Sequence, residues 1–156
     1  DPRTKTVNLS DPVYGSTSIA AIGVAAHECG HAMQDAQDYG PLRLRSALVP
    51  VANFGAQLSW PLIIIGLLLG GSSLISLGIL LFSLAVLFQL VTLPVEYNAS
   101  HRAVTLLDSI GILQGQEVGQ TRKVLHAAAL TYVAAAAGSI LQLLRLLILF
   151  GNRRDD

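Results

Sequence analysis

Two histidines and a glutamate in "AAHECGHAMQD" have the spacing of a metal-binding motif. His27 and His31 stand four residues apart, and Glu28 directly follows the first of them. Positions i and i+4 lie on one face of a helix, so both imidazoles can direct a nitrogen at one ion. Glu28 lies about 100° further around the helix, where it can reach a water molecule beside that ion. The pattern predicts two zinc ligands, His27 and His31, and a catalytic acid/base, Glu28.

A catalytic zinc usually takes three protein ligands, so a third must come from elsewhere in the chain. Asp35 lies two helical turns from His27, which is too far along the helix axis to share one ion. Glu96, in "LPVEYNASHRAV", is the first charged residue after a long uncharged run. A carboxylate at the end of a membrane span is costly unless it is paired or bound to a metal. We therefore expect Glu96 as the third ligand, against the alternative of an ordinary interfacial glutamate; the other candidates are Asp108, Glu117, His101 and His126.

Four further polar residues are weaker candidates for the site. Ser100 shares a helix face with the expected third ligand and could hydrogen-bond a ligand side chain. His101 or Arg102 could stabilise the oxyanion of a tetrahedral intermediate, although a solvated helix face is the simpler interpretation of this stretch. Tyr132 lies in an apolar stretch of the kind in which polar groups often have a function.

The composition indicates a membrane protein. Of the 156 residues, 52% are hydrophobic and only 13% are charged, whereas soluble proteins have about 25% charged residues. The formal net charge is zero, so nothing favours a nucleic-acid partner. The single cysteine, Cys29, cannot form an internal disulfide, and it faces away from both histidines on a helix.

Long apolar stretches predict the elements that position the motif. Residues 46–95 contain no Asp, Glu, Lys, Arg or His, which is long enough for two spans of about 20 residues each. We predict spans over residues 47–69 and 74–94, separated by "GGSS", and a less purely apolar span over residues 125–150. Each span would contact the lipid bilayer.

The segment before the spans carries its own signals. Side-chain character alternates along "RTKTVNLSD", which predicts a short strand or an extended segment. This segment could pair with an extended substrate or could be a structural arm. "DPVYG" reads as a turn, and a serine or threonine among residues 16–18 can cap a helix that runs to about Asp38. The predicted fold class is therefore an all-α integral membrane protein: the motif helix, about three transmembrane helices and a short N-terminal extended segment.

We expect one membrane domain over residues 1–156. Its parts are an N-terminal arm with the motif helix (1–45), a transmembrane hairpin (46–95), a cytoplasmic segment with the third ligand (96–124) and a third transmembrane helix (125–150). The positive-inside rule places residues 1–45 and 96–123 in the cytoplasm, because more Lys and Arg lie on that side of the hairpin. That side carries Arg3, Lys5, Arg43, Arg45, Arg102, Arg122 and Lys123, and the other side carries Arg153 and Arg154.

Several motifs together resemble one family. "AAHECGHAMQD", "PLRLRSALVPVAN", "LFQLVTLPVEYNASHRA" and "AAALTYVAAA" are similar to the bacterial YugP-like neutral zinc metallopeptidase family over nearly the whole chain. The resemblance implies His27, His31 and Glu96 as ligands and Glu28 as catalytic acid/base. It also implies an additional N-terminal membrane segment, so we expect this chain to be a fragment. "EYNAS" is distantly similar to the Glu-x-x-Ala-Asp element of the HtpX and CAAX prenyl proteases, with Ser100 in place of the Asp.

The expected function is that of a membrane-embedded zinc peptidase with its active site at the cytoplasmic face of the cell membrane. It would hydrolyse a peptide or a membrane-protein substrate with Zn²⁺ as cofactor. A non-catalytic membrane scaffold or chaperone-like protein with a structural metal site is the alternative, and an intramembrane-cleaving protease is a third interpretation. The acidic residues Asp35 and Asp38 on the motif helix fit that third interpretation less well.

Overall fold

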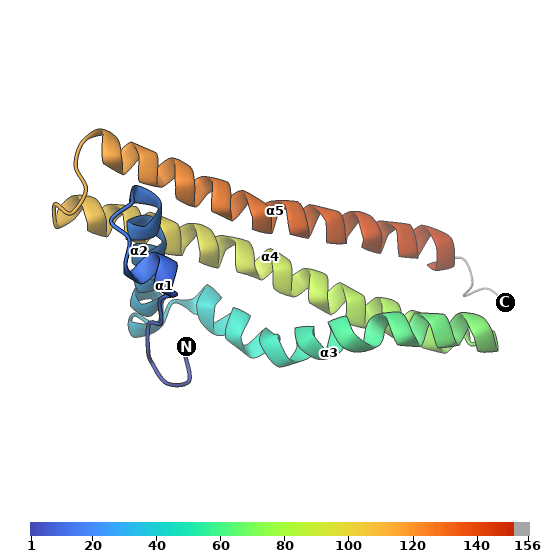
Figure 1. The fold of residues 1–156 in the computed structure, drawn as a ribbon. Coiled ribbons are helices and arrows are strands. Elements are labelled where there is room, and N and C mark those ends of the chain that lie inside the picture. The colour runs from blue at the N-terminus through green and yellow to red at the C-terminus, as the bar shows by residue number, and fades with distance from the viewer. Residues whose placement is uncertain (152–156) are drawn as a thin grey trace. The chain divides into compact units, whose positions relative to one another are not determined.

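The fold is built from helices alone over the residues that the structure describes. Figure 1 draws the computed structural model, which describes residues 1–151. Within them there are helices and connecting segments and no strand. In chain order the helices are α1 (Asp11–Tyr14), α2 (Ile19–Ala36), α3 (Gly40–Leu69), α4 (Ser72–Ser109) and α5 (Gln116–Phe150).

The predicted all-α fold with three membrane-length helices is confirmed. Helices α3, α4 and α5 are each long and apolar enough to cross a membrane. The break between the first two lies at Gly70 and Gly71, inside the predicted "GGSS" turn. Gly70 has a φ of 69°, in the left-handed region that glycine adopts at no steric cost, and this ends α3.

The membrane-length helices carry many apolar side chains on their surface. Leu68, Leu69 and Ile148 are 79%, 75% and 77% exposed. Continuous apolar surface of this kind is unfavourable in water and suits a lipid environment. The predicted contact with a bilayer has physical support in these side chains, whereas the side of the membrane is untested and Arg153 and Arg154 lie outside the described residues.

Of the two forms predicted for the N-terminal segment, strand or extended segment, only the strand is wrong, since residues 6–10 run without helix, turn or strand. No strand forms there, because no second strand exists among residues 1–151 to pair with it. Residues 2–5 form a turn instead, which the Thr6 amide closes by donating to the Asp1 carbonyl, and Lys5 has a φ of 54°. "DPVYG" forms the single helical turn α1 rather than a plain turn, since Pro12 is tolerated in the first turn of a helix, where its missing N–H needs no partner.

Helix α2 begins and ends close to its predicted limits. Ser18 caps it, because the Ser18 side chain accepts a hydrogen bond from the amide of Ala21. The helix ends at Ala36, two residues before the predicted end at Asp38, which has a φ of 50°. These ends fix which turns of α2 carry the histidines.

The chain forms two compact units. The first, here the motif unit, comprises Asp1–Arg43 and Leu93–Thr131, and the second, the apolar unit, comprises Leu44–Thr92 and the chain from Tyr132 on. Helix α2 and the unit's parts of α4 and α5 pack in the motif unit around one core. That core is made of Ala26, Ala103, Val104, Leu107, Leu113 and Leu125. The predicted domain limits remain a prediction.

Candidate metal centre

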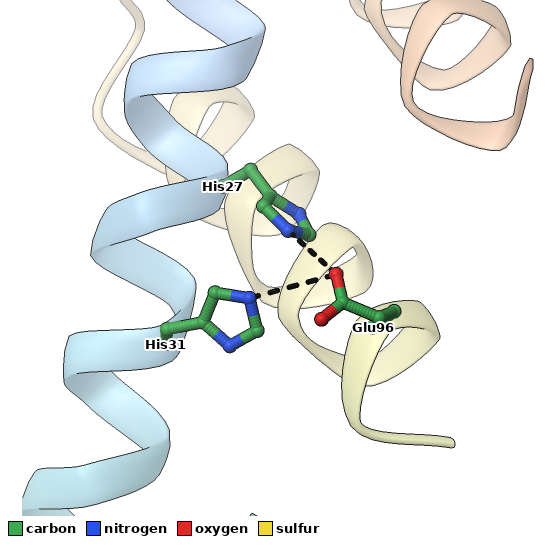
Figure 2. Close-up of side chains that lie close together, drawn as sticks. All are labelled: His27, His31 and Glu96. Carbon is green, nitrogen blue, oxygen red and sulfur yellow. Dashed lines mark hydrogen bonds and ion pairs between the residues drawn. The ribbon is translucent and has the colours of Figure 1, made fainter. Parts of the chain in front are cut away.

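Helices α2 and α4 bring the two histidines and Glu96 together. Figure 2 shows both imidazoles from α2 pointing at the carboxylate from α4. Nε2 of His27 lies 3.1 Å from Glu96 Oε2, and Nε2 of His31 lies 3.6 Å from the same oxygen. The potential ligand atoms of the three residues all lie within 4.8 Å of one another. Residues 69 and 65 positions apart in the sequence therefore form one cluster.

A glycine between the histidines permits this close approach of the helices. A Cβ atom on Gly30 would lie 2.4 Å from the carbonyl oxygen of Ala99, inside any tolerable contact distance. Ala99 itself is fully buried, and a small residue on each helix lets the two backbones meet. Gly30 thus faces α4 while the adjacent turns of α2 carry the imidazoles to Glu96.

Hydrogen bonds to the Nδ1 atoms orient the two imidazoles. Nδ1 of His27 lies 3.0 Å from Ser100 Oγ, and Nδ1 of His31 lies 3.0 Å from Gln34 Oε1. A metal-ligating histidine commonly donates its other ring N–H in this way, which fixes the tautomer and the ring plane. In both residues Nε2 is left as the nitrogen that faces the carboxylate.

Gln34 is itself held from the opposite side. Its side chain is fully buried, and its Nε2 donates to the Val95 carbonyl at 2.8 Å and to Asn98 Oδ1 at 3.0 Å. With both amide protons used, the Gln34 oxygen must face His31, so Nδ1 of His31 is the donor in that bond. This network therefore selects the tautomer of His31 whose Nε2 is free to bind an ion.

The distances fit a zinc ion. Two ligands at 2.0–2.1 Å from a tetrahedral ion are roughly 3.3 Å apart, close to the two distances from Glu96 to the histidines. The carboxylate is only 3% exposed, and such a buried charge needs a cationic partner. Two imidazoles and one carboxylate are also a donor set that catalytic zinc uses. The residues therefore fit the metal.

The electrostatics of the cluster favour a positive charge. Burial by itself lowers the pKa of His31, but the hydrogen bonds to Glu96 and Gln34 outweigh it, and the pKa is raised above its ordinary value. The negative potential of the Glu96 carboxylate that favours a proton also favours a metal cation.

The remaining predicted residues lie as follows. Glu28 is half-buried on α2, next to His27. His101 is exposed on α4 and belongs to no cluster of three ligand-type residues within residues 1–151.

Arg102 Nε donates to Asn98 Oδ1 at 2.7 Å, and its guanidinium lies over the Tyr39 ring, so its donors have partners outside the histidine cluster. Tyr132 is 42% exposed and belongs to the apolar unit, so its role stays a prediction.

No rival candidate for the third ligand joins the histidines in the part of the chain that is described. The cluster there contains Glu96 and none of Asp108, Glu117, His101 or His126. Asp35 pairs with Lys5 at 2.6 Å and with Arg43 at 2.9 Å instead of approaching the cluster. Cys29 is a free cysteine and is exposed on α2.

Sequence reasoning missed two residues that build this centre, Gln34 and Gly30. Gln34 follows His31 by three positions, a helical spacing that could have identified it as a partner. Gly30 lies inside the motif, where its lack of a side chain was the available signal. Ser100 was expected as a hydrogen-bond partner of a ligand, and its oxygen does lie beside His27.

Comparisons with known proteins identify the family of the chain. The family described as "Putative neutral zinc metallopeptidase" matches residues 1–151. The chain is 52% identical over 156 residues to the "Putative membrane protease YugP" of Bacillus subtilis (strain 168), covering 100% of this chain and 69% of that relative. No solved structure matches the chain significantly. The expected resemblance is confirmed, and the chain belongs to this neutral zinc metallopeptidase family.

Proposed function

We propose that this protein is a zinc-dependent membrane peptidase. His27, His31 and Glu96 hold the ion, and Glu28 is the catalytic acid/base. The observation that carries the proposal is the convergence of both Nε2 atoms on one Glu96 oxygen, at 3.1 and 3.6 Å. The family match and the membrane-protease relative support the same class of activity.

The roles of the chain's own residues follow from their chemistry. A bound zinc ion supplies a Lewis acid that makes water a nucleophile near neutral pH and polarises a peptide carbonyl. The Glu28 carboxylate accepts the proton that the attacking water loses, and later delivers that proton to the leaving amine. Ser100 and Gln34 keep the imidazoles of His27 and His31 in the ligating orientation.

The cluster supports catalysis over a purely structural site. Structural zinc sites are closed by four protein ligands, often cysteines. The cluster found within residues 1–151 offers three, and Cys29, inside the motif, is exposed and does not belong to the cluster. His27, His31 and Glu96 would supply the three protein ligands that are typical of catalytic zinc, whereas a structural site in a scaffold or chaperone-like protein would be expected to have four.

The location of the reaction is part of the proposal. We infer a multi-pass protein of the cell membrane with its active site at the cytoplasmic face, which acts on peptides or membrane proteins. The excess of Lys and Arg in the segments that carry His27, His31 and Glu96 supports this orientation. Labelling of intact cells would test it. In a chain that carries Cys29→Ser and Gln120→Cys, the single cysteine should react with an impermeant reagent only after the membrane is permeabilised, and reaction in intact cells would contradict the orientation.

Replacement of the acid/base tests the activity. Glu28→Gln removes the proton acceptor without touching a ligand, so peptide hydrolysis should fall by at least about 10²-fold. Zinc content, measured in the same samples, should stay at the wild-type level. The control is Gln120→Glu, a change at an exposed position of α5, which should leave both values unchanged. Hydrolysis by Glu28→Gln at the wild-type rate would refute the assigned role.

A further inference from the structure

A cavity with a basic lining lies beside the metal centre, in the motif unit. It has a volume of about 150 Å³. Its lining comes from one face of α4 and one face of α5 at the same helical spacing, i, i+3, i+4 and i+7. The residues are Tyr97, Ser100, His101 and Val104 on α4 and Arg122, Leu125, His126 and Ala129 on α5.

The cavity and the metal centre share a residue. Ser100 lines the cavity, and its Oγ lies 3.0 Å from Nδ1 of His27. Tyr97, another lining residue, directly follows Glu96 in the chain. A group that enters the cavity is therefore separated from the proposed ligand His27 by the Ser100 side chain.

The floor of the cavity is apolar and buried. Val104, Leu125 and Ala129 are 6%, 3% and 4% exposed, and the first two belong to the core of the motif unit. A volume of 150 Å³ holds about five water molecules at roughly 30 Å³ each. This is well below the 300 Å³ or more of a drug-sized site, so the cavity suits one amino-acid side chain.

The titratable side chains that line the cavity include three basic ones. Arg122, His101 and His126 lie at the cavity and are exposed, whereas none of the eight lining residues is acidic. No ion pair or hydrogen bond joins the Arg122 guanidinium to another side chain within residues 1–151. A cation without a counter-ion next to a half-apolar cavity is suited to a carboxylate, which it binds by charge-assisted hydrogen bonds.

We propose that this cavity is a substrate subsite that binds a carboxylate-bearing residue of the peptide, with Arg122 as the specificity-determining residue. The inference rests on the proposed peptidase function and adds a substrate class to it. The apolar floor takes the methylene groups of an Asp or Glu side chain, and Arg122 takes the carboxylate. A free C-terminal carboxylate has the same chemistry, and the experiment distinguishes the two sources.

Binding without cleavage tests the subsite. The full chain carrying Glu28→Gln, loaded with zinc in neutral detergent, would be titrated against four dansylated tripeptides by fluorescence anisotropy. The probes are Ala-Glu-Ala, Ala-Gln-Ala and Ala-Lys-Ala as C-terminal amides, and Ala-Gln-Ala as the free acid. We expect one of the two carboxylate probes to bind about tenfold tighter than the Ala-Gln-Ala amide. Preference for the Glu amide identifies a side-chain carboxylate, and preference for the free acid identifies a chain terminus.

Variants of Arg122 decide the outcome. Arg122→Gln should abolish the preference, and Arg122→Glu should transfer it to the Lys probe, which a misfolded protein would not do. Lys123→Gln, which removes the neighbouring exposed cation outside the cavity, should retain the preference. An unchanged preference in Arg122→Gln, or equal binding of all four probes, would overturn the proposal.

Two further results separate this subsite from the peptidase activity and from lipid binding. If the preference depends on Arg122 while wild-type protein cleaves no peptide, the subsite stands and the peptidase function fails. If nanodiscs with 30% phosphatidylglycerol remove the preference that neutral nanodiscs retain, an anionic lipid headgroup is the occupant and the peptide proposal is overturned.

Discussion

Each unit contains a glycine at which two helices pack closely, but the two contacts have different consequences. In the motif unit a Cβ on Gly30 would lie 2.4 Å from the Ala99 carbonyl oxygen of α4. In the apolar unit a Cβ on Gly55 of α3 would lie 2.5 Å from the Leu81 carbonyl oxygen of α4. Small residues allow helices to approach closely in both places, as they commonly do in membrane proteins.

The difference lies in what surrounds each contact. Around Gly30 the neighbouring turns carry His27, His31 and Gln34, each hydrogen-bonded to a residue of α4 or to one another. Around Gly55 the helix is mainly apolar, with Phe54 67% exposed. Close packing thus sets the geometry of a polar cluster in one unit and provides helix association in the other. The predictions below test that distinction.

The largest effect should follow from Gly30→Ala. Alanine gains about 1 kcal/mol of helix propensity over glycine, but the clash with Ala99 must separate α2 from α4, and overpacking costs about 1–3 kcal/mol. Because the separation moves both histidines from Glu96, zinc affinity should fall by at least about 100-fold. Zinc titration with a competing chelator measures this.

Gly55→Ala is the matched control for that contact. It should lower thermal stability in detergent by about as much as Gly30→Ala does, yet the folded protein should retain wild-type zinc affinity. The distinction between the units would be wrong if Gly55→Ala weakened zinc binding as much as Gly30→Ala, or if neither did.

A smaller effect is expected for Gln34→Leu. The substitution removes the acceptor for Nδ1 of His31 and the donor to the Val95 carbonyl, while it roughly conserves volume. Loss of such a partner typically costs 10- to 100-fold in metal affinity, so we expect a value of about that size. Gln120→Leu, at an exposed position, is the control. Unchanged affinity would show that the His31 orientation does not depend on Gln34.

Ser100→Ala should have a milder consequence, because a water molecule can replace the lost hydroxyl at the half-buried His27. We expect zinc affinity to fall roughly tenfold and Ser100→Thr to restore most of it. A threonine variant as weak as the alanine variant would indicate a packing role for Ser100 in place of the hydrogen bond.

The smallest effect concerns the N-terminal arm. The Lys5 hydrogen bond lowers the pKa of Asp35, with Arg43 adding to the effect. Because the pKa is depressed in the folded state, the stabilisation is present above the ordinary value of 3.8 and is lost as pH falls through the folded value. Asp35→Asn should therefore lower Tm slightly at pH 7, and the difference from wild type should narrow below pH 3.8. A difference independent of pH would contradict this origin.

The sequence predicted the parts of the molecule that local chemistry determines. The uncharged run before Glu96 indicates spans by composition, and His27 and His31 share a helix face by their spacing alone. Of the two forms predicted for the N-terminal segment, the strand was wrong, since alternation near Lys5 does not show whether a partner strand exists. The spacing of Gln34 from His31 was a local signal, but the contact of Gly30 with Ala99 and the bond from Gln34 to Val95 were not predictable, because α4 lies more than sixty residues away in the chain. Contacts at such separation leave no local periodicity.

The most direct test of the whole account is the zinc affinity of Glu96→Gln. The amide keeps the size of the side chain and removes its charge, so the rest of the buried cluster can stay in place. We predict one zinc per wild-type chain and an affinity at least about 100-fold weaker in Glu96→Gln, measured by competition with a chelator. Zinc binding by Glu96→Gln as tight as by the wild-type chain would contradict the three-residue centre on which the proposed function depends.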